Sequence, residues 1–206
     1  MYFRRGIFIV FEGIDGCGKS TQIKRFADYL FNLDKYNHIV LTRNPYKDID
    51  IRNILKEDSN PLTKAERLAE LFIQDREKHV KELILPNLKK GCFVISDRFK
   101  LSTIAYQSAQ GLDINELIKR NNKFPVPDIT FLIDLPVEEA IKRRKEEKER
   151  DEQKFESDKE FQEKVRVNYL KIKELLKENI IIIDGNRSVD EIFFDIKKIF
   201  NHFITR

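Results

Sequence analysis

Cysteine, histidine and long apolar runs are scarce in this chain of 206 residues. The two cysteines, Cys17 and Cys92, do not have the spacing of a disulfide framework or a zinc site, which favours a reducing compartment. The three histidines lie far apart, so we expect surface or core histidines rather than metal ligands. No stretch approaches the ~20 apolar residues of a membrane span, and the apolar run before Glu12 is too short for a signal peptide. We therefore expect a soluble, cytoplasmic protein without a membrane partner.

The sequence also has no large excess of positive or negative residues. The chain has 39 Lys and Arg against 35 Asp and Glu, and the two signs are mixed along its length. Because nucleic-acid-binding proteins carry a basic patch or stripe, we expect no nucleic-acid partner. A chain of this length can bury one sizeable core but is short for two ordinary domains. The sequence thus predicts one domain over residues 1–206.

The most informative stretch is FEGIDGCGKSTQ at residues 11–22. Gly13, four free positions, and then Gly18, Lys19 and Ser20 have the spacing of a phosphate-binding loop between a strand and a helix. Glycines let backbone N–H groups approach phosphate oxygens, and the helix that follows presents the positive end of its dipole. This pattern predicts a nucleotide phosphate site. Lys19 would neutralise the outer phosphates, and the Ser20 hydroxyl would hold Mg²⁺.

Short apolar runs alternate with helical patterns five times. This alternation predicts a doubly wound α/β fold, with a five-stranded parallel sheet and helices on both faces. Thr63 and Glu66 have the spacing of a capping box, and Ser188 is expected to cap the last helix. The helix after Thr63 should bend or end before Pro86. The expected strands are residues 7–11, 38–42, 92–96, 129–135 and 180–184.

Candidate polar residues directly follow the expected strands, where sheets of this type bind ligands. Asp15 lies in the phosphate loop, Arg43 follows the second strand, and Asp97 and Arg98 follow the third. A second substrate that carries a phosphate would explain several arginines at this edge. Simpler alternatives stay open for each residue. The arginines could be surface cations, and Asp97 could be a helix N-cap paired with Arg98.

Several segments, spread over nearly the whole chain, resemble the thymidylate kinases, a family of P-loop nucleoside monophosphate kinases. The resemblance implies transfer of the γ-phosphoryl group of ATP to dTMP, giving dTDP and ADP for dTTP synthesis, with Mg²⁺ as cofactor and a homodimer as the assembly. The segments that carry it are FEGIDGCGKSTQ (11–22), LTRNP (41–45), LFIQDR (71–76), SDRFKLSTIAYQ (96–107), PDITFLIDL (127–135) and KFESDKEFQEKVRVNYL (154–170).

The resemblance implies a binding site for the thymine base. Phe72 would stack on the ring while Arg76 hydrogen-bonds its edge, and residues four apart share one face of a helix. Phe72 could instead be a core residue, which is the usual place of a helical phenylalanine. Thr103 and Gln107 are expected near the base.

The resemblance also implies how the sugar and the acceptor phosphate bind. Tyr106 would pack where a ribose 2′-OH would lie, which favours the deoxy sugar. Asp15 would accept a hydrogen bond from the 3′-OH, and Arg43 and Arg98 would hold the phosphate. Ser102 falls on the same helical stripe as Arg98 and Tyr106 and is expected in the dTMP site.

On the donor side, the resemblance implies that Arg143 contacts adenine and that Asp97 joins Ser20 at Mg²⁺ or its waters. The phosphate of dTMP is already largely dianionic at neutral pH, since the second pKa of a phosphate monoester is about 6. Catalysis therefore needs positioned cations such as Lys19 and Arg98 rather than a strong base. The expected ATP-binding residues of the loop are Gly13, Asp15, Gly16, Cys17, Gly18, Lys19, Ser20 and Thr21.

A run of consecutive charged residues, 142–152, falls where these kinases have a short mobile lid, here approximately 142–156. Some family members carry a catalytic arginine in the phosphate loop, at the place of Gly16 in this chain. We therefore expect a lid arginine to supply that charge, with Arg150 as the first candidate and Arg144 as the second. A solvated helix with alternating salt bridges is the alternative for most of the run.

The chain departs from the family after the second strand, where the common Arg-Glu-Pro is Arg43-Asn44-Pro45. We expect the Asn44–Pro45 peptide to be cis. A deoxynucleoside kinase or a broader pyrimidine monophosphate kinase is the nearest alternative, although Arg43 and Arg98 together argue against a nucleoside acceptor. A P-loop regulatory protein or nucleic-acid-binding ATPase is a remote one, because a guanine-reading Asn-Lys-x-Asp is absent.

Overall fold

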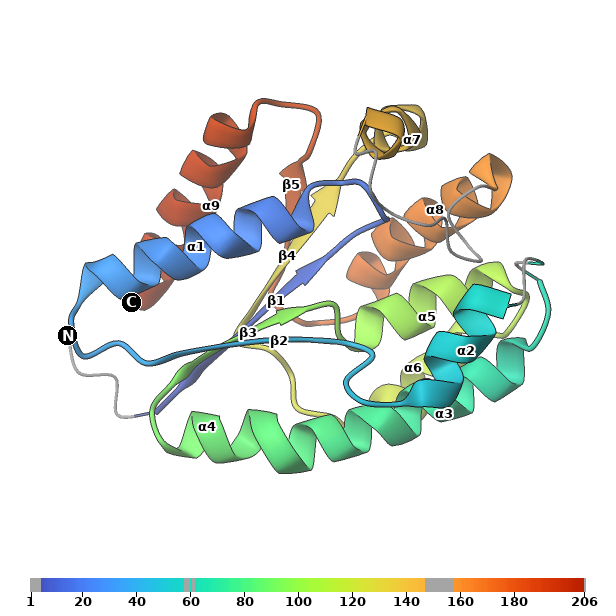
Figure 1. Ribbon diagram of the computed structural model, residues 1–206, viewed down its shortest axis with the longest axis horizontal. Coiled ribbons are helices and arrows are strands. Elements are labelled where there is room, and N and C mark those ends of the chain that lie inside the picture. The colour runs from blue at the N-terminus through green and yellow to red at the C-terminus, as the bar shows by residue number, and fades with distance from the viewer. Residues whose placement is uncertain (1–4, 58–59, 61, 147–157, 206) are drawn as a thin grey trace.

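The computed structural model describes residues 5–57, 60, 62–146 and 158–205. Within these ranges, five parallel strands form one sheet in the order β2-β3-β1-β4-β5, with helices on both faces (Figure 1). The predicted doubly wound α/β fold is confirmed, and every strand lies within one residue of its predicted bounds. The strands are β1 (Ile7–Glu12), β2 (Ile39–Arg43), β3 (Phe93–Asp97), β4 (Ile129–Asp134) and β5 (Ile180–Asp184).

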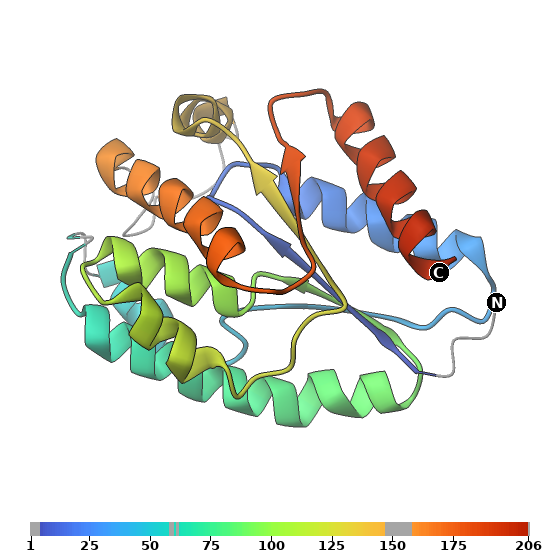
Figure 2. The same ribbon diagram turned by 180° about the vertical axis from the view of Figure 1, so that it is seen from behind.

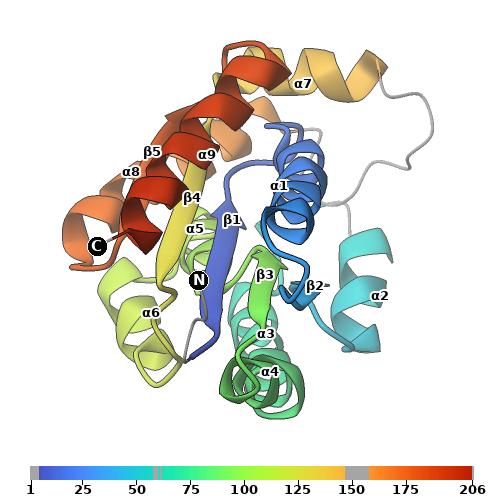
Figure 3. The ribbon, with the colours of Figure 1, turned by 90° about the vertical axis from the view of Figure 1, so that its left-hand side faces the viewer.

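The helices of the described residues are α1 (Lys19–Leu33), α2 (Ile49–Glu57), α3 (Ala65–His79), α4 (Leu85–Lys89), α5 (Lys100–Ala109), α6 (Ile114–Asn121), α7 (Val137–Glu146), α8 (Lys159–Leu175) and α9 (Val189–Ile204). Helices α1 and α9 pack together on one face of the sheet (Figure 3). On the other face, α5 packs against α3 and α8 (Figure 2). None of these helices has the length and apolar character needed to cross a membrane.

Strand β1 lies in the middle of the sheet and is buried along its whole length. Successive side chains point to opposite faces, so each face receives its own aromatic contacts. Phe11 packs against Phe26 of α1 with ring centroids 5.8 Å apart, and Phe8 packs edge-on against Phe99 at 5.0 Å. The loop that follows Glu12 therefore starts from a strand that is fixed on both sides.

The starts of two helices test the capping predictions. Ser188 caps α9 as predicted, through a complete capping box. At α3 the predicted capping box of Thr63 and Glu66 is wrong. Lys64 occupies the N-cap in a left-handed conformation and makes no side-chain cap hydrogen bond. The Thr63 hydroxyl instead donates to the carbonyl oxygen of Asn60 at 3.1 Å, because the turn before the helix offers a competing acceptor.

The α-helical hydrogen-bonding pattern of α3 ends at His79, before Pro86 as predicted, but the chain remains helical through the proline. A π-helical segment, η1 (Val80–Ile84), connects α3 to α4. Pro86 falls in the first turn of α4, directly after the π-helical segment, so the change of hydrogen-bonding pattern coincides with a residue that has no backbone N–H to donate. The chain thus continues in one direction through three helical segments without a loop.

A buried ion pair joins the start of α5 to the chain just before β5. Lys100 Nζ lies 2.6 Å from Glu178 Oε1, and the two side chains are only 4% and 12% exposed. The other carboxylate oxygen, Glu178 Oε2, is buried and has no hydrogen-bond partner among the described residues. The Glu178 carboxylate therefore depends on Lys100 for compensation of its charge.

Lys100→Met is expected to lower the free energy of unfolding by about 3 kcal/mol, because it leaves Glu178 buried without its partner. Urea unfolding followed by circular dichroism measures the change. The double variant Lys100→Met with Glu178→Met removes both charges and should recover most of the loss. A loss below about 1 kcal/mol in the single variant would assign the pair to the class of weak surface ion pairs.

Candidate active site

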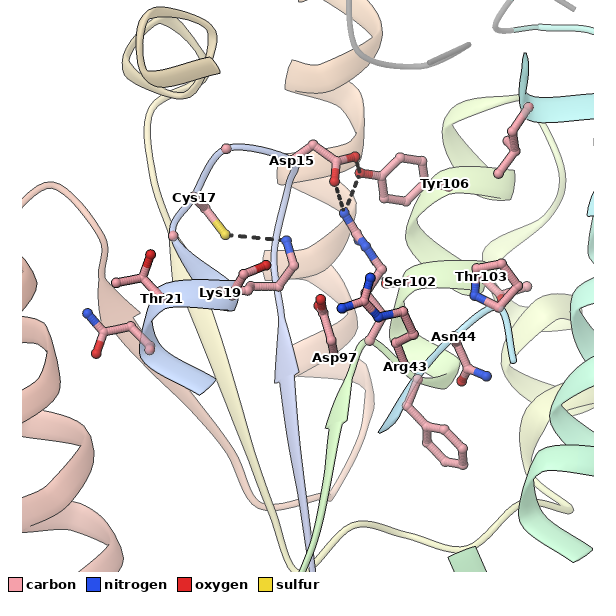
Figure 4. A pocket seen from close by; sticks show the side chains of 18 of the residues that line it. Asp15, Cys17, Lys19, Thr21, Arg43, Asn44, Asp97, Ser102, Thr103 and Tyr106 are labelled. Carbon is pink, nitrogen blue, oxygen red and sulfur yellow. Dashed lines mark hydrogen bonds and ion pairs between the residues drawn. The ribbon is translucent and has the colours of Figure 1, made fainter. Parts of the chain in front are cut away.

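A cavity of about 1100 Å³ lies at the carboxyl ends of the central strands (Figure 4). The structure brings to it nearly all residues predicted from the sequence, while their roles stay predictions. Gly13 lies at the base of the loop and is not part of the lining. Arg150 lies outside the described residues. The predicted residues that line the cavity are Asp15, Gly16, Cys17, Gly18, Lys19, Ser20, Thr21, Arg43, Phe72, Arg76, Asp97, Arg98, Ser102, Thr103, Tyr106, Gln107 and Arg143.

The phosphate loop requires glycine at two positions. Gly13 and Gly16 have positive φ values of 138° and 84°. A Cβ atom on Gly13 would lie 2.5 Å from the carbonyl oxygen of Ile133, and one on Gly16 would lie 2.6 Å from that of Ala140. Both neighbours are backbone atoms and cannot move aside easily. The loop therefore packs closely against the end of β4 at Gly13 and against α7 at Gly16.

Lys19 is folded back over this loop. Its Nζ donates to the carbonyl oxygens of Gly13 at 3.0 Å and Ile14 at 2.8 Å, and the side chain is almost fully buried. Gly18 is the N-cap of α1 and supplies no side-chain cap, so the first N–H groups of this 15-residue helix stay available to an anion. The loop thus places one ammonium group and a helix N-terminus together.

Arg98 connects the phosphate loop to α5. Its Nη2 lies 2.7 Å from Asp15 Oδ1, and the Tyr106 hydroxyl donates to Asp15 Oδ2 at 3.0 Å (Figure 4). Burial by itself would raise the pKa of Asp15, but the charges of Arg98 and Lys19 outweigh it and hold that pKa well below its usual range. Burial also raises the pKa of Tyr106 far above its usual value, so its hydroxyl stays protonated. Asp15 is therefore an anion held between two donors.

The backbone of Arg98 is unusual as well. Its φ of 69° is a left-handed conformation that residues other than glycine rarely adopt. Its N–H donates to the carbonyl oxygen of Phe11 at 2.9 Å, and its Nη1 donates to the hydroxyls of Ser102 and Tyr169 at 3.0 and 3.1 Å. The surrounding contacts hold the side chain in the cavity despite the strained backbone.

Glu12 is a buried residue of this site that the sequence did not reveal. Its carboxylate accepts hydrogen bonds from the Phe99 N–H at 2.8 Å, the Ser102 hydroxyl at 2.6 Å and the Tyr169 hydroxyl at 3.1 Å. These contacts fix the start of α5 against the end of β1. The sequence did contain a signal for this role, because Glu12 is an acidic residue at the end of an otherwise apolar strand. A carboxylate buried there requires hydrogen-bond partners.

Phe72 and Arg76 both face the cavity from α3, as their spacing predicted. Phe72 is half-buried, whereas Arg76 is completely buried and donates to Asn121 Oδ1 at 2.7 Å and Thr103 Oγ1 at 2.6 Å. Burial lowers the pKa of Arg76 to about 10, which leaves it charged at pH 7. Its Nε is buried and has no hydrogen-bond partner among the described residues, so the hydrogen-bonding capacity of Arg76 is not fully used within the protein.

Arg43 reaches the cavity at the end of β2, beside Asp97 in the register of the two strands. The Asn44 N–H extends this pairing by donating to the carbonyl oxygen of Asp97 at 3.0 Å. The Asn44–Pro45 peptide is cis, which confirms that prediction. The cavity edge formed by β2 and β3 thus carries a guanidinium group and a carboxylate side by side.

The candidate oxygen ligands for Mg²⁺ come from the end of β3 and from the first turn of α1. Asp97 ends β3 at the cavity, and its Oδ1 is buried without a hydrogen-bond partner among the described residues. Ser20 lies in the first turn of α1 with an exposed side chain. A carboxylate and a hydroxyl are ligands of the kind that Mg²⁺ prefers, with waters and phosphates completing its shell. These residues fit the cation.

The turn between β5 and α9 also contributes to the cavity, and the sequence analysis did not predict it. Arg143 Nη2 donates to the carbonyl oxygen of Gly185 at 3.0 Å, which brings α7 next to this turn. The position of the turn after a strand was a usable signal, because ligands bind where parallel strands end. The additional lining residues here are Arg187, Ser188, Val189 and Ile192.

Comparisons with known proteins agree with this geometry. A family described as thymidylate kinase matches residues 11–196. A probable thymidylate kinase of Pyrococcus abyssi is 40% identical over 206 residues, covering 96% of this chain and 97% of the relative. A thymidylate kinase of Thermosipho melanesiensis is 42% identical over 201 residues, covering 94% and 96%. The crystal structure of thymidylate kinase from Ehrlichia chaffeensis matches with a TM-score of 0.74 at 30% identity, covering 95% and 98% of the two chains.

Proposed function

Because the chain belongs to the thymidylate kinase family and phosphorylates dTMP, we propose that its cavity holds ATP at the phosphate loop and dTMP between α3 and α5. The observation that best supports this arrangement is the Asp15–Arg98 ion pair of 2.7 Å. It joins the donor loop to the helix that forms the acceptor side, so both substrates share one charged centre. The reaction transfers the γ-phosphoryl group of ATP and gives dTDP and ADP.

On the donor side, the triphosphate binds to the loop from Gly13 to Thr21 and to Lys19, while Arg143 contacts the adenine. Ser20 and Asp97 hold Mg²⁺, either directly or through its waters. The cation, when bound, screens the charge between the donor phosphates and the attacking anion. The unpartnered Asp97 Oδ1 supports this assignment.

On the acceptor side, Phe72 stacks on the thymine ring, and Arg76 hydrogen-bonds the edge of the base. Thr103 and Gln107 lie next to the base on α5. The contacts of the buried Arg76 with Asn121 and Thr103 support this role, since they fix the guanidinium before a ligand arrives.

Sugar and phosphate bind nearer the loop. Asp15 accepts a hydrogen bond from the 3′-OH, and the Tyr106 ring fills the space of a 2′-OH, with Ser102 below it. Arg43 and Arg98, which both line the cavity, bind the acceptor phosphate. No general base is required, because that phosphate is largely dianionic at neutral pH, so these cations act by positioning and charge stabilisation.

An arginine of the lid, approximately residues 142–156, supplies the positive charge that stabilises the transferred phosphoryl group. Arg150 is our first choice, and Arg144, which lies beside Gly16, is the second. Arg150→Ala is expected to lower kcat by about a hundredfold or more while changing the Kd for dTMP little, because its charge acts on the transferred group. Steady-state kinetics and calorimetry measure the two quantities. Unchanged turnover in Arg150→Ala would move the role to Arg144 or remove it from the lid.

The organisation of the protein is also part of the proposal. We propose a single kinase domain over residues 1–206 with this short lid, a cytoplasmic location and a homodimeric assembly. Light scattering coupled to size-exclusion chromatography measures the assembly. A mass of one chain, 24.6 kDa, at micromolar concentration would contradict the homodimer.

The function is tested by measuring ADP release with ATP and Mg²⁺ across a panel of acceptors: dTMP, dUMP, UMP, CMP, AMP, GMP and thymidine. We expect dTMP to have the highest kcat/KM. Thymidine as the best acceptor would indicate a deoxynucleoside kinase, and comparable activity with UMP and CMP would indicate a broader pyrimidine monophosphate kinase.

A further inference from the structure

His79, the last residue of α3, is a buried polar residue that the proposed reaction does not use. Its side chain is 0% exposed, and both ring nitrogens have partners. Nε2 lies 2.7 Å from the Thr42 hydroxyl, and Nδ1 lies 3.0 Å from the Asn44 side-chain nitrogen. The imidazole therefore bridges the two residues that flank Arg43.

This bridge determines where Arg43 can point. Successive side chains of an extended segment alternate between opposite sides, so Thr42 and Asn44 share one side and Arg43 takes the other. Figure 4 shows Arg43 directed toward the Lys19 side of the cavity and Asn44 directed away from it. The Arg43 guanidinium has no hydrogen bond or ion pair with another described residue, so its direction depends on its backbone and neighbours.

Asp75, one turn before His79 on α3, holds the next part of the same segment. Its carboxylate is 1% exposed and accepts the backbone N–H groups of Tyr46, Lys47 and Asp48. The Tyr46 ring also stacks on the imidazole, with centroids 4.5 Å apart. Helix α3 thus anchors the chain on both sides of the cis peptide.

The protonation state of His79 matches this geometry. Burial lowers the pKa of His79 to about 4, the charge of Asp75 raises it by less, and the charge of Arg76 lowers it further, so the ring is neutral at pH 7. A neutral imidazole has one donor and one acceptor nitrogen. Nδ1 accepts from the Asn44 amide while Nε2–H donates to Thr42, and a single tautomer satisfies both contacts.

We propose that His79 is a positioning residue for the acceptor phosphate: by bridging Thr42 and Asn44 it directs Arg43 into the cavity. Helix α3 would then position both ends of the acceptor dTMP. Phe72 and Arg76 contact its base, and His79 supports Arg43, which binds its phosphate. This inference rests on the proposed role of Arg43. It predicts that loss of the bridge weakens recognition of the phosphate and not of the nucleoside.

The test compares the affinities of the full chain for dTMP and thymidine by calorimetry. The ratio of the two affinities isolates the contribution of the phosphate. Arg43→Ala should lower this ratio by about tenfold or more, since it removes a charge-assisted contact, and His79→Leu should lower it by about three- to tenfold. The double variant should lose no more than Arg43→Ala alone, because both changes remove the same contact.

Val80→Ala is the matched control, since Val80 is the adjacent buried residue and contacts neither Thr42 nor Asn44 through a hydrogen bond. It should lower stability and leave the ratio unchanged. If His79→Leu does not fold, Thr42→Val removes one arm of the bridge with little change of shape, and the ratio should still fall.

The outcomes separate this inference from the proposed function. If Arg43→Ala lowers the ratio but His79→Leu or Thr42→Val does not, the positioning role of His79 is wrong and the role of Arg43 stands. Multiplicative losses in the double variant would also overturn it. If Arg43→Ala itself leaves the ratio unchanged, the assignment of Arg43 to the phosphate is wrong, and the inference about His79 falls with it.

Discussion

Lys19→Met is expected to lower kcat by about a thousandfold or more, a loss of about 4 kcal/mol in transition-state stabilisation. The Nζ of Lys19 is held by the carbonyl oxygens of Gly13 and Ile14, so its charge is in place before the substrates bind. Methionine retains an unbranched side chain of similar length and removes only the charge and its donors. ADP release under saturating ATP and dTMP measures the change.

Binding of dTMP provides the internal control for this variant. Because we assign Lys19 to the ATP side of the cavity, the Kd for dTMP measured without ATP should change by only a few-fold, which is far less than the change in kcat. Circular dichroism checks that the fold is retained. A fall in kcat below tenfold would mean that another cation carries the charge on the outer phosphates.

Arg98→Ala is expected to lower kcat/KM for dTMP by about a thousandfold, the second large effect. The variant removes the proposed ligand of the acceptor phosphate and also the partner of Asp15, whose carboxylate would then remain with Tyr106 as its only donor among the contacts described above. Both consequences act on the acceptor. The KM for ATP should change much less than the KM for dTMP.

Arg98→Lys is the matched control for this prediction. Lysine keeps the positive charge but cannot replace the planar group that contacts Asp15, Ser102 and Tyr169 at the same time. We expect it to recover only part of the lost kcat/KM. Full activity in Arg98→Lys would show that charge alone matters, and full activity in Arg98→Ala would remove the residue from the site.

The sheet and the phosphate loop could be predicted from the sequence because their signals are local. The strand Ile129–Asp134 is a nearly continuous apolar run, and the glycines of the loop occur at a fixed spacing before a helix. The rule that ligands bind where parallel strands end then placed Arg43, Asp97 and Arg98 at one edge. All three line the cavity.

Contacts between residues far apart in the chain could not be predicted in this way. Glu12 and Tyr169 are separated by 157 positions, and no periodicity relates them. The bridge made by His79 was equally hidden, because a single histidine in a helix indicates only a core or surface residue. The failed capping prediction at Thr63 is different, since its signal was local but the preceding Asn60 carbonyl competed for the hydroxyl.

The central position of β1 has a consequence for the order in which the protein forms. Its partners are made late: Ile7 pairs with Phe93, and Ile9 pairs with Ile129. At roughly 5–20 residues per second, β1 leaves the ribosome several seconds before either partner strand exists. The proposed phosphate-binding loop follows β1 directly, so it acquires its shape only after most of the chain has been synthesised. Nascent chains that end before β4 should therefore not retain nucleotide.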